Sequence, residues 1–146
     1  MGQQQLLLVI LVTIIVGIAT VVAINTFSSA ADSANLDAVR QDVANIAASA
    51  QSYYMKPTQL GGGGQDFSVI TFRNISFPSD SIDTADFLSA VNPNGKYVIS
   101  ARSATGFTVT AHPNSDEDFD GTMADNATNT LAATASRDDL TWTDNN

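Results

Sequence analysis

The chain has 146 residues and a formal net charge of −9, from 15 acidic and 6 basic side chains. This excess of negative charge repels phosphate groups, so nucleic acid is not a predicted partner. The absence of cysteine excludes disulfide frameworks, thiolate metal sites and cysteine nucleophiles.

The first predicted element is an apolar helix. Residues 6–27 read LLLVILVTIIVGIATVVAINTF, and no charged residue occurs before Asp32. About 22 residues extend roughly 33 Å as a helix, enough to cross the core of a bilayer. A single segment in lipid satisfies its backbone hydrogen bonds only as a helix, which overrides its many β-branched residues. Thr13 and Thr20 can bond back to the helix backbone.

A secretory signal peptide is the competing interpretation of this segment. Such peptides begin with positive charge and have a shorter apolar core. Here residues 1–5 read MGQQQ, the apolar run is longer, and no clear small-x-small cleavage site follows it. The pattern instead continues as helix.

The continuation, residues 28–56, is predicted to be amphipathic. Apolar positions recur at steps of three and four and form one stripe, with Asp37, Gln41, Asp42 and Asn45 on the other face. One helix is therefore expected from near Gln3 to about Met55, ending at Pro57. The stripe consists of Leu36, Val39, Val43, Ile46, Ala47, Ala50, Tyr53 and Tyr54.

The rest of the chain predicts a β-rich head. Strand character is present at 66–73, 96–102, 107–111, 130–136 and 140–143, and a short helix capped by Asp83 is expected at 83–91. The run Asn92-Pro93-Asn94-Gly95 predicts a turn. The expected fold class is α+β: a helix (1–56), a flexible Gly-rich connection (57–65) and an antiparallel meander of about four strands (66–146).

This arrangement resembles the type IV pilins and the related pseudopilins. In that family a helix with an apolar first half and an amphipathic second half packs under a small antiparallel sheet. The resemblance covers roughly the first 55 residues, and the head only by size and strand pattern. It implies an inner-membrane anchor that later becomes the core of an extracellular filament. The implied partners are identical subunits, the membrane, and pilus or secretion assembly machinery.

The chain departs from the family pattern at its start. Members usually carry a basic leader that ends in Gly, then Phe or Met, with Glu at the fifth mature position. Here Met1 alone precedes Gly2, and Gln5 stands where counting from Met1 would place the Glu. Cleavage by a prepilin peptidase therefore stays open. Gln3, Gln4 and Gln5 can hydrogen-bond between subunits or form a polar interfacial end.

The predicted assembly surface lies on the apolar helix. Thr13 and Gly17 have a small-xxx-small spacing that allows close helix packing, although Gly17 is equally consistent with a tolerated flexible point. The assembly residues are Leu6, Leu7, Val9, Ile10, Thr13, Ile14, Gly17, Ile18 and Val21.

One motif suggests a metal site. Asp116, Asp118 and Asp120 precede Gly121 in a D-x-D-x-D-G pattern, the opening of a calcium loop. The twelfth position, Ala127, is not the Glu of an EF-hand, so a solvated acidic turn is the competing interpretation. No other cofactor is expected.

The sequence predicts no enzyme. It has neither a G-x-S-x-G nucleophile motif nor a glycine-rich phosphate loop. Two N-glycosylation sequons occur, at 74–76 and 126–128.

Three functions remain open: a pilus-like filament subunit, a pseudopilin of a secretion or DNA-uptake machine, and a membrane-tethered binding protein with a calcium-binding head. The filament subunit is the leading hypothesis, because a plain anchor does not need a helix that continues under the head.

Overall fold

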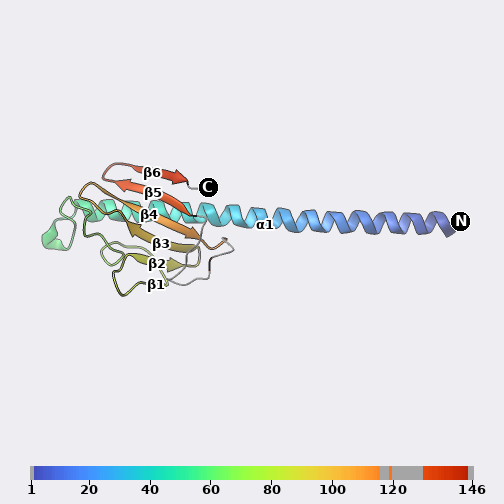
Figure 1. The fold of residues 1–146 in the computed structure, drawn as a ribbon, viewed down its shortest axis with the longest axis horizontal. Coiled ribbons are helices and arrows are strands. Elements are labelled where there is room, and N and C mark those ends of the chain that lie inside the picture. Colours follow the sequence, from blue (N-terminus) through green and yellow to red (C-terminus); the bar gives the residue numbers. More distant parts are fainter. Residues whose placement is uncertain (1, 116–118, 120–129, 145–146) are drawn as a thin grey trace. The chain divides into compact units, whose positions relative to one another are not determined.

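The computed structural model describes residues 2–115, 119 and 130–144, which form one long helix and a six-stranded antiparallel sheet (Figure 1). This confirms the predicted α+β class. The chain divides into two compact units, residues 1–34 and 35–146. The elements are α1 (Gly2–Met55), the 3-10 helix η1 (Thr58–Leu60), β1 (Ser81–Ile82), β2 (Ser89–Asn92), β3 (Gly95–Ser100), β4 (Gly106–Pro113), β5 (Leu131–Ser136) and β6 (Leu140–Asp144).

The described part of the first unit is entirely helical. Residues 2–34 all belong to α1, and each of them is exposed. The predicted start of the helix near Gln3 and its predicted end at about Met55 are both confirmed. The β-branched residues of this segment have therefore not produced strands.

The second unit is built around a meander. Each strand pairs with the next one along the chain, in the order β1-β2-β3-β4-β5-β6, and every pair is antiparallel. The register places Ile99 opposite Val109, and Val109 opposite Ala133. Because side chains alternate along a strand, these residues share one face of the sheet.

The core of the second unit lies between this face and the second half of α1. The predicted apolar stripe is confirmed: Leu36 and Tyr54 are partly buried, and the other six residues are buried. From the sheet, Tyr97 and Ile99 of β3 and Phe107 of β4 are at most 1% exposed. Burial of this apolar surface on both sides stabilises the packing, at roughly 25 cal/mol per Å².

The predicted strand at 66–73 is wrong, because this segment forms turns. The Asp66 carboxylate accepts the Ser68 amide at 2.7 Å, and the Ile70 amide donates to the Phe67 carbonyl at 3.0 Å. These local bonds use backbone groups that a strand would offer to a neighbour. Its apolar side chains still enter the core, where Phe67 packs between Tyr54 and Phe107 with ring centroids 4.6 and 5.3 Å away.

The predicted helix at 83–91 is also wrong. The carboxylate of Asp83 accepts the amide of Ala85, and that of Asp86 accepts the amide of Leu88. Such Asx turns compete with helix formation. The residues that follow form β2, so the sheet has six strands rather than about four.

The glycine run after α1 forms a hydrogen-bonded turn, where the sequence suggested a flexible connection. The amides of Gly61, Gly62, Gly63 and Gly64 donate to the carbonyls of Thr58, Pro57, Tyr53 and Lys56. A Cβ on Gly62 would lie 2.1 Å from the Lys56 carbonyl oxygen, and Gly61 has a φ of +76°. Glycine is needed here for close backbone approach and for a left-handed conformation.

Candidate functional site

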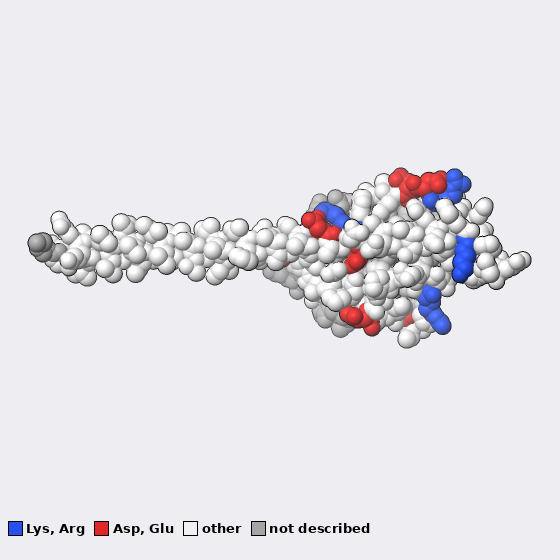
Figure 2. Space-filling view, turned by 180° about the vertical axis from the view of Figure 1, so that it is seen from behind, with Lys and Arg blue, Asp and Glu red and all other residues white. Residues whose placement is uncertain are grey.

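The predicted assembly surface is fully displayed on α1. Between Leu6 and Ile24 the large apolar side chains are 48–66% exposed, and Thr13 and Gly17 are exposed as well. In the space-filling view this part of the chain carries neither blue nor red atoms (Figure 2). All nine predicted assembly residues therefore lie on the surface of the first unit. An apolar patch that extends around a whole helix is far from what a soluble monomer tolerates.

The few polar groups of this helix are satisfied internally. The Thr13 hydroxyl donates to the carbonyls of Ile10 at 2.8 Å and Val9 at 3.1 Å, and the Thr20 hydroxyl donates to Val16 at 2.8 Å. This confirms the expected bonds to the helix's own backbone. The two threonines consequently present methyl groups and a satisfied hydroxyl to any apolar neighbour.

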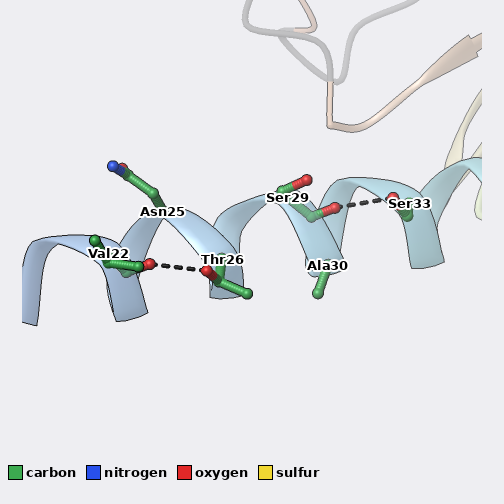
Figure 3. Close-up of a pocket in the computed structure, with 6 residues that line it drawn as sticks. All are labelled: Val22, Asn25, Thr26, Ser29, Ala30 and Ser33. Carbon is green, nitrogen blue, oxygen red and sulfur yellow. Dashed lines mark hydrogen bonds between the residues drawn. The ribbon is translucent and has the colours of Figure 1, made fainter. Parts of the chain in front are cut away.

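Polar character increases toward the end of the first unit. One face of the helix carries Asn25, Thr26, Ser29 and Ser33 at helical spacing (Figure 3). Thr26 and Ser33 donate to the carbonyls four residues before them, whereas the Asn25 side chain projects away from the helix. Asn25 has no hydrogen-bond partner within residues 2–115, 119 and 130–144. After the apolar run of residues 6–24, Asn25 is the first side chain of the helix whose polar groups are not satisfied within the helix.

The proposed calcium ligands Asp116, Asp118 and Asp120 lie outside the described residues, as does Ala127. A different carboxylate, that of Asp42, is buried, although the sequence predicted it on the solvent face of the helix. Asp42 is only 9% exposed. Its assignment to the solvent face is wrong, and the cause is a set of partners distant in sequence.

Asp42 joins α1 to the turn between β2 and β3. Its Oδ2 accepts three hydrogen bonds from side chains. The donors are the Tyr97 hydroxyl at 2.7 Å and the side-chain amides of Asn92 and Asn94, each at 2.8 Å. The Asn92 Oδ1 in turn accepts the backbone amides of Asn94 and Gly95, which orders the turn. Hydrogen bonds from several donors compensate the desolvation of a buried carboxylate.

The Tyr97 hydroxyl is held in its protonated form. Burial raises its pKa well above the usual range, and the hydrogen bond to Asp42 raises it further. It therefore donates to the carboxylate at every ordinary pH. Two features of the sequence point to this network. One is the turn motif at 92–95, which a Tyr follows at position 97, and the other is an Asp that lies next to the apolar stripe of the helix, Asp42.

No family model, curated protein or solved structure matches the chain. Two features of the structure bear on function. One is the exposed apolar surface of residues 6–24. The other is a head in which α1 is fastened to the sheet by its apolar stripe and by Asp42. Together they describe a folded, water-compatible head and a segment that is not compatible with water. By length and composition, α1 is apolar enough to span a membrane.

Proposed function

We propose that the chain is the structural subunit of a pilus-like filament, built by packing the apolar helices of identical copies. The observation that carries the proposal is the surface of residues 6–24, where every large apolar side chain is about half exposed or more. Removing this surface from water stabilises assembly, at roughly 25 cal/mol per Å² of apolar area. Two surroundings can remove this surface from water, namely lipid and other copies of the same helix.

Charge supports self-association of this segment. When identical helices pack side by side in a common direction, each residue type comes close to copies of itself. Residues 2–31 carry no ionisable side chain, so such a bundle contains no like-charge repulsion. The charged residues begin at Asp32, so the net charge of −9 belongs to the part of the chain from Asp32 onward. That charge keeps the heads soluble and discourages random aggregation.

The membrane has a role before assembly in this proposal. A helix that lies in lipid associates with others through packing and not through the hydrophobic effect, because lipid tails are as apolar as its own side chains. The subunit therefore waits in the inner membrane, with its head outside, until assembly machinery transfers the helix to the growing filament. The finished filament is extracellular, with heads outward.

Replacing Ile14 by Asp tests the proposal. A buried unpaired carboxylate in a bundle of apolar helices costs several kcal/mol per subunit, so we expect filaments to disappear from negative-stain images of the cells. Near-ultraviolet circular dichroism of the detergent-solubilised chain should remain that of the wild type, since Ile14 lies outside the head. Filaments of normal length in the variant would refute the proposal.

Ala48→Asp is the matched control. Ala48 is an exposed residue in the second half of α1, so the same new charge there remains solvated and filaments should form. The membrane-tethered alternative makes the opposite prediction for the wild type: it would give single detergent-bound chains and no filaments under any condition.

A further inference from the structure

The turn at residues 71–76 presents a sequon in an accessible form. Asn74 and Ser76 are exposed, whereas Ile75 between them is 8% exposed and belongs to the core. The backbone amide of Asn74 donates to the Thr71 carbonyl at 3.0 Å and closes the turn. The buried Ile75 thus fixes the turn on the head while both residues of the sequon that carry chemistry face outward.

A groove lined by both polar and apolar side chains adjoins this turn. Its polar lining consists of Asn74 and Ser76 from the turn, Ser49 and Ser52 from α1, and Lys56, which follows α1. Tyr53 and Ile75 supply the apolar lining. The Ser49 hydroxyl donates to the Ser76 carbonyl at 2.9 Å, which holds the two sides together. The Ser52 hydroxyl and the Lys56 ammonium can each donate to a sugar oxygen, and the Ser49 hydroxyl, whose proton is already donated to Ser76, can accept from a sugar hydroxyl.

We propose that Asn74 is the attachment site of an N-linked glycan whose first sugar lies in this groove. The inference rests on the proposed function in one respect, namely that the head is outside the membrane. The class of donor is a glycan linked to a lipid through phosphate, transferred by an oligosaccharyltransferase. N-x-S/T sequons are the acceptor for this reaction in exported chains.

The reaction balances without an oxidant or reductant. A bond forms between the Asn74 Nδ2 and C1 of the first sugar, and the bond between C1 and the phosphate oxygen breaks. The lipid phosphate leaves with the bonding electrons, and the amide nitrogen releases one proton. The Nδ2 keeps its second hydrogen. It can therefore retain the 3.2 Å hydrogen bond that it donates to the Val69 carbonyl, which orients the side chain.

Mass spectrometry of the chain purified from the cells that naturally make it tests the proposal. Trypsin cuts after Arg73 and Lys96, and the peptide 74–96 contains no other N-x-S/T sequence. We expect that peptide, and the intact chain, to carry the added mass of a glycan. The mass should disappear in Asn74→Gln and in Ser76→Ala, and it should persist in Ser76→Thr, which preserves the sequon.

Two results would overturn the assignment. One is a peptide 74–96 found only at its unmodified mass, and the other is an added mass that persists in Asn74→Gln, which would place the sugar on a hydroxyl. Asn126→Gln is the control, because it removes the second sequon and should leave peptide 74–96 modified. Images of the same cells separate the two proposals: filaments without the mass reject only the glycan, and the mass without filaments rejects only the filament.

Discussion

The Tyr97 hydroxyl in β3 donates a 2.7 Å hydrogen bond to the Asp42 carboxylate in α1, across 55 positions of sequence. Both residues are buried. The contact fixes the rotation of the helix about its own axis relative to the sheet, which apolar packing alone specifies less strictly.

Asp42→Ala should destabilise the head by about 3 kcal/mol, because it leaves the donors of Asn92, Asn94 and Tyr97 without their acceptor. Urea unfolding of the full chain in detergent, followed by near-ultraviolet circular dichroism, measures the loss. Asp37→Ala is the control. The Asp37 side chain is 78% exposed and its ion pair with Arg40 is on the surface, so the loss should stay below about 1 kcal/mol. Equal losses in the two variants would contradict the role given to Asp42.

Tyr97→Phe should change how stability depends on alkaline pH. The pKa of Tyr97 in the folded head is raised above its unfolded value of about 10, so its contribution is fully present below pH 10 and is lost as pH rises further. At pH 8 we expect the variant to be less stable by about 1–2 kcal/mol. The gap between wild type and variant should narrow above pH 10, as measured by thermal melting in a pH series. A gap that stays constant up to about pH 11.5, well above the ordinary tyrosine pKa of about 10, would reject this linkage.

Gly62→Ala should destabilise the turn that ends α1. The added Cβ would lie 2.1 Å from the Lys56 carbonyl oxygen, so the backbone must shift, at a cost of about 1–3 kcal/mol. Gly61→Asn is the matched comparison, because Gly61 has a positive φ and open space around it. Asn tolerates the left-handed region, so that variant should lose less than about 1 kcal/mol. If Gly61→Asn proved the more damaging of the two in urea unfolding, this account of the turn would be wrong.

Gly17→Leu separates contacts within the chain from contacts between chains. A Cβ at Gly17 meets no atom within 4 Å, so head stability should be unchanged and the helix itself should gain about 1 kcal/mol in propensity. If filament helices approach closely at this glycine, the larger side chain prevents it and the sedimentable fraction of the protein should fall at least tenfold. Ile18→Leu keeps the local volume and should sediment as the wild type does. Normal filaments of Gly17→Leu would exclude close packing at this position.

The parts of the fold that the sequence predicted are those governed by regular periodicity. The helix stripe from Leu36 to Tyr54 repeats every three to four residues, and the hairpin of β3 and β4 alternates with a period of two. The turn at 92–95 contains residue types that favour turns for local steric reasons. Such signals do not depend on distant partners, so they could be found without a structure.

The errors have a common physical cause. Asp66, Asp83 and Asp86 hydrogen-bond to amides two residues ahead, and these local bonds override the strand and helix patterns around them. The prediction for Asp42 is wrong for the opposite reason. Its partners are 50 to 55 positions away, so the helical periodicity alone places it on the surface. The exposure of the assembly residues was predictable from their composition. Which of them would touch another copy in the proposed filament depends on atoms that a single chain does not contain.

The internal bonding of Thr13 and Thr20 has a consequence for transfer between surroundings. Since neither hydroxyl donates to solvent, residues 6–24 can move from one apolar environment to another without breaking or forming any polar contact. Extraction from one medium and insertion into the next then differ little in free energy. In the proposed transfer from lipid to filament, the free-energy difference would therefore depend on the ends of the stretch, where Asn25 and the glutamines at 3–5 would need new polar partners.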